Sequence, residues 1–364
     1  MTPPQAPTAP HKPEDDQATQ LRAMVAEMES RARGLERVPA RESAPRPERP
    51  APLRPAPRSG ATRTETPGAR ADAVRRHSAP HGAARPRARI IAVASGKGGV
   101  GKTNMCVNIC VAMAMRGRRA ILLDGDLGLA NADVLCGVTA GANLGHVLEG
   151  TRSLDEIIIE APGGFGLIPG AAGMAHLAHS GRERRQSLLK RLGAMERAAD
   201  VIVIDCGAGI GGSVMSFVQA ADLAMIVATP EPTSIADAYA LIKCTHSLKV
   251  RTGSTTPGCG VLINQAVDED EAKRAYARMA GVCERFLRMR PELIGWTPSD
   301  PRVPEAVRAR VPVLVRSPRA RVSQAVRVVA GSLSDRLELD RCASDARSGL
   351  LARLFGLRGR NRRS

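Results

Sequence analysis

The stretch that decides the fold runs from Ile90 to Thr103 and reads IIAVASGKGGVGKT. Its apolar beginning, Ile90–Val93, has the composition of a buried strand. Residues Gly96–Thr103 then follow the spacing G-x-x-x-x-G-K-T of a phosphate-binding loop. A helical pattern from Met105 to Met115 comes next, so the motif has the strand before it and the helix after it that it requires. A chance glycine-rich turn is the weaker alternative.

This loop carries the residues expected to bind ATP with Mg²⁺. Its glycines let successive backbone N–H groups point at the phosphates, and the helix start adds the positive end of its dipole. We expect Lys102 to reach the β- and γ-phosphates and Thr103 to bind Mg²⁺. The predicted nucleotide contacts come from the whole loop and the residue after it: Gly96, Lys97, Gly98, Gly99, Val100, Gly101, Lys102, Thr103 and Asn104.

Short apolar runs alternate with helical stretches along the middle of the chain. This order is typical of an α/β domain with a mostly parallel central sheet and helices on both faces. Together with the loop it predicts a P-loop NTPase fold for residues 89–339, preceded by a disordered N-terminal leader. The runs expected to be strands are Ile90–Val93, Ala120–Leu123, Val201–Ile204, Ala224–Ala228, Gly260–Ile263 and Leu293–Trp296.

Carboxylates at the ends of two predicted strands suit an Mg²⁺ and phosphate site. Asp126, in the segment DGDLGLANAD, is the candidate for orienting the attacking water, with a hydrogen-bonded turn former as the alternative. Asp124 is the weaker candidate and is suited to bracing the loop. Asp205 follows four apolar residues, and we expect both Asp205 and Asp126 to hold Mg²⁺ through water. The predicted catalytic residues are Lys97, Lys102, Asp126 and Asp205.

The spacing of the cysteines and the net charge limit which classes of function the sequence can have. The eight cysteines are scattered singly without a C-x-x-C pair, which indicates a reducing compartment and small core residues. No signal-peptide pattern and no apolar run of about 20 residues is present, so we predict a cytoplasmic protein. The net charge of +17 invites nucleic-acid binding, but much of the excess lies in the leader and the last residues. Direct DNA binding by the folded part is therefore disfavoured.

The residues before the ATPase region divide into two parts. Within residues 1–35, the apolar side chains of Leu21, Met24, Val25 and Met28 recur at helical spacing and predict a short amphipathic helix. Such a helix is marginal alone, so it either binds a partner or folds back onto its own domain. Residues 36–88 are rich in proline and arginine and are expected to be a disordered linker.

The segment 340–364 combines leucines with arginines. On a helix, one face would carry Leu350, Leu351, Leu354 and Phe355, while arginines flank it. A basic amphipathic helix of this kind binds an anionic membrane surface. The alternative is a last helix packed on the core and followed by a solvated arginine tail.

Lys97 is an odd residue for a turn that only has to be tight. The run KGGVGKT at Lys97–Thr103 resembles the motif K-G-G-x-G-K-[ST] of the MinD/ParA family of deviant Walker A ATPases. The resemblance implies an ATP-dependent homodimer in which Lys97 reaches the partner's ATP, and hydrolysis that needs Asp126. It also implies a base pocket near Asn264 and Asp300.

Further segments are similar to the flagellar branch of this family, the FlhG/FleN proteins. These are Asn104 after the loop and the stretches 126–133 and 229–243. The run DQATQLR resembles the element D-Q-A-x-x-L-R with which that branch activates the GTPase FlhF. Its matching residues here are Asp16, Gln17, Ala18, Leu21 and Arg22.

The resemblance implies a switch that controls flagellar number and placement and lies on the inner face of the cytoplasmic membrane when ATP is bound. Its implied partners are a second copy of the chain, an FlhF-type GTPase and an anionic membrane, with flagellar switch-ring proteins or a flagellar transcription regulator as further candidates. Two alternatives stay open at this point. They are a MinD-like division-site regulator and a ParA-like, DNA-associated or transcriptional regulator.

Overall fold

The computed structural model describes residues 87–126, 130–171, 198–252 and 258–339. The predicted N-terminal helix, the linker and the predicted membrane segment 340–364 lie outside these residues. Within the described ranges, no helix is long and apolar enough to cross a membrane.

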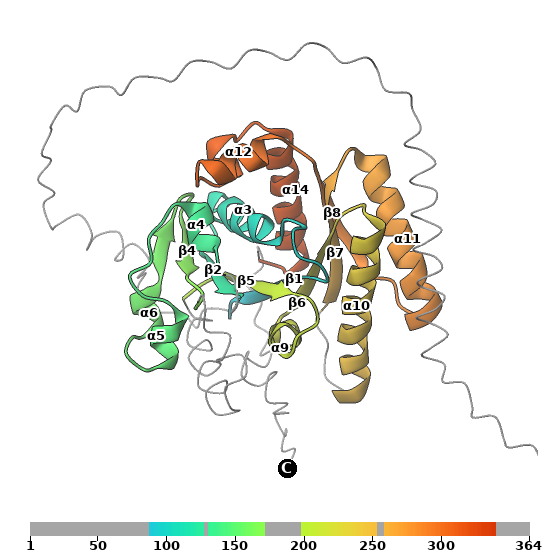
Figure 1. Cartoon of the computed structure of the whole chain (residues 1–364), viewed down its shortest axis with the longest axis horizontal. Coiled ribbons are helices and arrows are strands. Elements are labelled where there is room, and N and C mark those ends of the chain that lie inside the picture. Colours follow the sequence, from blue (N-terminus) through green and yellow to red (C-terminus); the bar gives the residue numbers. More distant parts are fainter. Residues whose placement is uncertain (1–86, 127–129, 172–197, 253–257, 340–364) are drawn as a thin grey trace, which may run out of the picture. The chain divides into compact units, whose positions relative to one another are not determined.

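An eight-stranded sheet with the order β3-β4-β2-β5-β1-β6-β7-β8 forms the centre of the domain (Figure 1). Neighbouring strands are parallel except for the pair β3 and β4. The strands are β1 (Arg89–Ser95), β2 (Ala120–Gly125), β3 (Ile159–Ala161), β4 (Phe165–Ile168), β5 (Val201–Ala208), β6 (Leu223–Ala228), β7 (Gly258–Ala266) and β8 (Glu292–Pro298).

Helices cover both faces of this sheet. The helix α3 packs against α14 on one face, whereas α10 contacts both α9 and α11 on the other (Figure 1). The helices are α3 (Lys102–Met115), α4 (Ala132–Cys136), α5 (Leu144–Leu148), α6 (Leu154–Ile157), α9 (Gly212–Ala220), α10 (Pro232–Thr252), α11 (Glu269–Leu287), α12 (Arg302–Arg308), α13 (Val313–Arg316) and α14 (Arg321–Arg336). The predicted P-loop NTPase fold is therefore confirmed.

The core shows the alternation that a doubly covered sheet requires. Ile91 and Val93 of β1 belong to a buried cluster with residues of α3 and α14. Their neighbours Ile90 and Ala92 are equally buried outside that cluster. Because successive side chains of a strand point to opposite faces, they pack toward the second layer of helices. The near-continuous apolar runs of the sequence follow from burial on both faces.

All six predicted strands are present, and two short strands at the sheet edge were not predicted. These are β3 and β4, which pair antiparallel. The chain reverses between them through Gly163 and Gly164, whose φ angles of 100° and 82° lie in the left-handed region. Strands of three and four residues carry too little periodicity to stand out in the sequence.

Candidate functional site

The phosphate-binding loop joins β1 to α3 and is held close at both ends. A Cβ atom added to Gly96 would lie 2.2 Å from the backbone oxygen of Asp237 in α10. At Gly101, where φ is 85°, a Cβ would lie 2.4 Å from Nδ2 of Asn264. Only glycine fits these two positions, since elements distant in sequence approach the backbone there. The loop is thus clamped between β7 and α10.

Asn264 holds the loop from the end of β7. Its Nδ2 atom donates a hydrogen bond to the carbonyl oxygen of Val100 over 2.7 Å, and its Oδ1 atom accepts one from Oγ1 of Thr297 over 2.5 Å. The side chain is buried. The resemblance placed Asn264 near a base pocket, and the structure places it against the backbone of the phosphate loop.

Lys102 and Asp205 form a buried ion pair at the centre of the site. The Lys102 Nζ atom lies 2.6 Å from Oδ1 of Asp205, and the two side chains are only 9% and 1% exposed. Burial by itself lowers the pKa of Lys102, but the Asp205 carboxylate outweighs this effect, so the pKa is raised. The lysine therefore remains charged.

Asp205 also offers a second carboxylate oxygen. Its Oδ2 atom is buried and has no hydrogen-bond partner among the described residues. A buried carboxylate oxygen without a donor is costly unless something satisfies it. Water held by Mg²⁺ would supply that donor, and half-buried Thr103 lies in the first turn of α3 in the same site. The residues present fit a hydrated magnesium ion.

Asp124 and Asp126, at the end of β2, have different surroundings. The Asp124 carboxylate accepts hydrogen bonds from the backbone N–H groups of Asp126, Asn131 and Ala132 at 3.0 to 3.2 Å. Burial raises the pKa of Asp124 to about 7, although these N–H groups oppose the shift. Asp124 thus braces the loop after β2.

The half-buried Asp126 faces the loop that follows β5. A Cβ atom added to Gly207 would lie 3.6 Å from its carboxylate. The neighbouring strands β2 and β5 pair in register, with Asp124 opposite Asp205. The structure therefore brings Asp126, Asp205 and the phosphate loop to one edge of the sheet.

Lys97 occupies a different position from the other lysine of the loop. Its Nζ atom lies 2.9 Å from Oε2 of Glu231, which precedes α10, and 3.2 Å from Oγ1 of Thr233 in the first turn of α10. The Lys97 and Glu231 side chains are 42% and 63% exposed. One lysine of the loop is thus buried beside Asp205, and the other lies at the surface.

Asp300 lies after β8, and its carboxylate is engaged by backbone groups. The N–H groups of Arg302 and Val322 donate to it over 2.9 Å and 3.4 Å. Asp300 thereby connects the starts of α12 and α14. Within the described residues, no hydrogen bond joins the Asp300 side chain to the phosphate loop, in contrast to that of Asn264.

Cys206, next to Asp205, is one of the cysteines that the sequence predicts to be small core residues. The side chain is buried, and burial raises its pKa. A thiol that stays protonated is a poor nucleophile. Of the seven described cysteines, Cys244 and Cys259 are half-buried and the others are buried.

Comparison with known proteins bears on this arrangement. A family model described as an AAA domain matches residues 88–255, which include the phosphate loop, Asp126 and Asp205. The antiactivator FleN of Pseudomonas aeruginosa is 41% identical over 242 residues, which are 66% of this chain and 85% of that protein. The flagellum site-determining protein YlxH of Helicobacter pylori is 34% identical over 252 residues, or 69% and 83% of the two chains.

A solved structure shows the same architecture. The cell division ATPase MinD of Pyrococcus furiosus aligns with a TM-score of 0.58 and 26% identity, over 68% of this chain and 99% of that chain. The likeness in sequence and the likeness in fold therefore point to the same group of proteins.

Proposed function

Because this chain belongs to the FlhG/FleN group of the MinD/ParA family of P-loop ATPases, we propose that it is an ATP-hydrolysing, dimerising switch that controls flagellar number and placement. The phosphate loop and three of the four predicted catalytic residues, Lys102, Asp126 and Asp205, meet at one edge of the sheet. The exposed position of Lys97 is the observation that carries the dimerising part of the proposal.

The described residues have distinct tasks in ATP hydrolysis. Lys102 exchanges its ion pair with Asp205 for the phosphate oxygens, and the loop backbone supplies further N–H donors. Thr103 and Asp205 hold Mg²⁺, which when bound neutralises charge on the phosphates. Asp126 orients the attacking water from the end of β2. Gly209, with a φ of 90°, lets the loop after β5 change its path.

Lys97 acts on the nucleotide that is bound to the second chain of the dimer. Its ammonium group is held by the exposed Glu231 and Thr233 of its own chain, and an exposed ion pair stabilises by about 1 kcal/mol at most. Lys97 can therefore leave this contact at little cost and add positive charge to the nucleotide of a partner copy. A charge supplied in this way stabilises phosphoryl transfer.

Dimerisation can be tested with one substitution in the loop. With a non-hydrolysable ATP analogue and Mg²⁺, we expect the wild-type protein to sediment as a dimer and Lys97→Ala to bind the analogue but stay monomeric. Lys273→Ala, which removes an exposed lysine from α11, is the matched control and should dimerise. Dimerisation of Lys97→Ala at the wild-type protein concentration would contradict the proposal.

The terminal segments, both outside the described residues, are proposed to connect the switch to its surroundings. The run Asp16–Arg22 activates an FlhF-type GTPase, and the face of Leu350, Leu351, Leu354 and Phe355 binds an anionic membrane in the ATP-bound dimer. The GTPase test compares the wild-type chain with Gln17→Ala/Leu21→Ala. If both raise the GTPase rate of FlhF equally, the N-terminal segment is not the activator.

A further inference from the structure

The strand β7 is irregular where it lies beside the phosphate loop. Its register against β8 shifts between Ile263 and Ala266, and within this irregularity Gln265 has a φ of 60°. That angle lies in the left-handed region, which a residue with a Cβ atom rarely adopts. Irregularities of this kind are common next to active sites, where they redirect a side chain. Gln265 is therefore held in a conformation that regular strand pairing does not require.

Three other non-glycine residues in the described part of the chain have a positive φ, and all three end helices. Arg288 is the C-cap of α11, Arg310 follows the C-cap of α12, and Glu338 follows that of α14. A left-handed residue is common at a helix end, where its backbone satisfies the last carbonyl groups. Gln265 lies in a strand, so this explanation does not apply to it. Backbone strain outside helix ends clusters at functional sites.

The side chain of Gln265 lies against the end of the phosphate loop. A Cβ atom added to Gly101 would lie 3.5 Å from its Nε2 atom. The amide of the preceding residue, Asn264, donates to Val100 and accepts from Thr297. The Gln265 side chain, by contrast, is exposed, and no hydrogen bond of its amide is found within the described residues. Of two successive amides at the loop, one fixes the loop and the other is available to a ligand.

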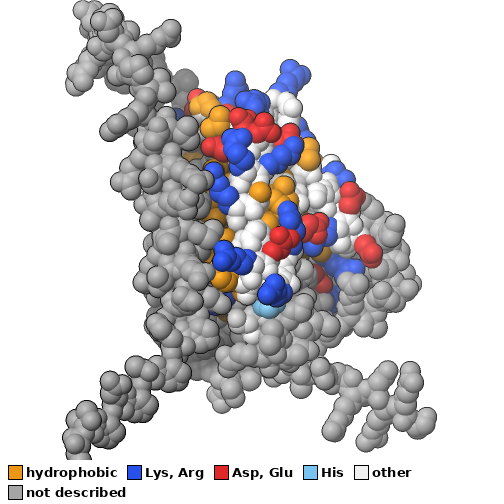
Figure 2. All heavy atoms as spheres, turned by 90° about the vertical axis from the view of Figure 1, so that its right-hand side faces the viewer, with side chains coloured by type: hydrophobic (Ala, Val, Ile, Leu, Met, Phe, Trp, Pro, Cys, Tyr) orange, Lys and Arg blue, Asp and Glu red, His pale blue; other side chains and the backbone are white. Residues whose placement is uncertain are grey.

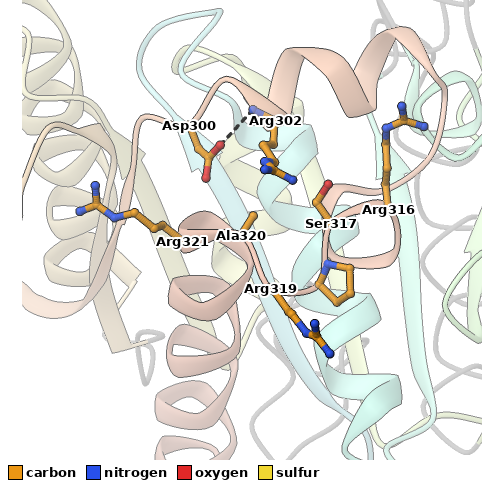
Figure 3. A pocket seen from close by; sticks show the side chains of 8 residues that line it. Asp300, Arg302, Arg316, Ser317, Arg319, Ala320 and Arg321 are labelled. Atoms are coloured by element: carbon orange, nitrogen blue, oxygen red, sulfur yellow. Dashed lines mark hydrogen bonds between the residues drawn. The ribbon is translucent and has the colours of Figure 1, made fainter.

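The irregular part of β7 also contacts the segment that leads to Asp300. The N–H group of Ser299 donates to the carbonyl oxygen of Ala266 over 2.8 Å. A cavity of about 670 Å³ follows, between Asp300 and the segment 316–321 (Figure 3). Its volume is that of a small-molecule site. Gln265 thus lies between the phosphate loop on one side and the segment that borders this cavity on the other.

The cavity suits the uncharged end of a nucleotide. The side chains of Arg316, Arg319 and Arg321 extend in different directions, so they do not converge on one anion (Figure 3). The Asp300 carboxylate is engaged by backbone N–H groups. A nucleotide that has its phosphates on the loop and its base toward this cavity passes Gln265 with its sugar. An amide N–H group can donate a hydrogen bond to a sugar oxygen.

We propose that Gln265 binds the nucleoside part of ATP through its side-chain amide, and that its left-handed backbone directs the amide there. The inference rests on the proposed ATP binding and adds the residue that holds the nucleotide between its phosphates and its base. Glycine at this position would adopt the same backbone conformation without strain but would supply no amide. The variant Gln265→Gly therefore separates nucleotide affinity from stability.

Calorimetric titration with two probes tests the proposal. Mg-ADP carries the nucleoside, whereas Mg-pyrophosphate occupies the phosphate loop alone. We expect Gln265→Gly to bind ADP roughly fivefold to tenfold more weakly than the wild type, because one hydrogen bond is lost, and to bind pyrophosphate equally well. The thermal midpoint of the variant should be no lower than that of the wild type, because the strain is relieved.

Arg288→Gly is the matched control. Arg288 is also exposed and has a φ of 53°, but it ends α11, whereas Gln265 precedes the start of that helix. The helix α11 lies on the side of the molecule that Figure 2 shows, where basic and acidic side chains intermingle. This variant should keep its thermal midpoint and bind both probes as the wild type does.

Two results would overturn the proposal. One is equal ADP affinity of Gln265→Gly and the wild type. The other is a loss of the same factor for ADP and for pyrophosphate, because Gln265 would then act through the loop and not on the nucleoside. If the wild type binds neither probe, the proposed ATP site itself is wrong, so the two failures are distinguishable.

Discussion

At the scale of single residues, the ion pair between Lys102 and Asp205 gives a stability prediction. Removing one partner leaves the other charge buried, which costs about 3 to 5 kcal/mol. We therefore expect Lys102→Met and Asp205→Asn each to lower the free energy of unfolding of the nucleotide-free protein. The double variant should lose clearly less free energy of unfolding than the two single variants lose together, because it leaves no buried charge. Urea denaturation measures all three.

The exposed pair of Glu269 and Lys273 on α11 is the control for this cycle. Replacing either or both of its members should change stability little, because the charges stay in water. If the losses of Lys102→Met and Asp205→Asn add without coupling, the buried ion pair is not the source of their effect. All variants of Lys102 and Asp205 should have weaker Mg-ATP binding whatever their stability.

Asp124 predicts how stability depends on pH. Its pKa in the folded protein is raised to about 7, whereas an aspartate in the unfolded chain titrates near about 3.9. The folded state therefore holds the proton more tightly, and the stability that this supplies is present below about pH 4 and lost as pH rises through about 7. Between pH 5 and 8, titration of Asp124 should lower the free energy of unfolding of the wild type by roughly 2 kcal/mol, which corresponds to several degrees in the thermal midpoint.

Thermal unfolding of Asp124→Asn tests this dependence. The variant cannot titrate at this position, so its midpoint should fall less between pH 5 and 8 than that of the wild type. Asp155→Asn, at a solvent-exposed position on α6, is the control and should follow the wild type. Parallel pH profiles for Asp124→Asn and the wild type would rule out Asp124 as the titrating group.

At the scale of elements, Asn264 couples β7 to the phosphate loop. Asn264→Ala removes the donor to Val100 and leaves the Thr297 hydroxyl without its acceptor, which costs about 1 to 3 kcal/mol of stability. Because the loop then loses a fixed point, we expect ATP affinity to fall by roughly tenfold, measured with a fluorescent nucleotide.

A helix cap elsewhere in the domain supplies the control for that prediction. Asn143→Ala removes the N-cap of α5 and costs about 1 kcal/mol, but it touches no residue of the loop. It should be less stable with unchanged ATP affinity. If the two variants lose affinity equally, general destabilisation rather than the Asn264 contact explains the effect.

The elements also show which features local sequence can reveal. The six longer strands were predictable because burial on both faces produces continuous apolar runs. The strands β3 and β4 were not, although the Gly163-Gly164 pair between two short apolar runs was a usable turn signal. Local pattern likewise singled out the phosphate loop, Asp126 and Asp205 as candidates, because each follows a run of apolar strand residues.

Local sequence patterns do not predict contacts between residues that are far apart in the chain. Asn264 donates to Val100, 164 positions away, and no spacing rule connects the two residues. The sequence therefore indicates which side chains can do chemistry, while the tertiary fold decides which of them meet.

At the scale of the whole molecule, the proposed switch depends on two weak interactions acting together. One amphipathic segment binds a membrane marginally, whereas two segments in one dimer bind it with much higher avidity. ATP is proposed to control this avidity through dimerisation at Lys97, so membrane binding should require both the nucleotide site and the segment 340–364. Under this proposal, neither the nucleotide site nor the segment 340–364 is sufficient for membrane binding by itself.

Sedimentation with phosphatidylglycerol vesicles and Mg-ATP tests this dependence. We expect the wild type to sediment with the vesicles. The vesicle affinity of Lys102→Ala, and that of a chain truncated before Gly349, should be lower by at least about tenfold, so both should remain mostly in solution. Raising the salt concentration should weaken binding of the wild type, because arginines contact the anionic surface. Vesicles of neutral lipid are the control and should bind none of the three proteins well. The proposal requires the ATP-bound dimer to hold two segments at one surface. Equal sedimentation of all three proteins on the anionic vesicles would therefore show that ATP does not switch the membrane association.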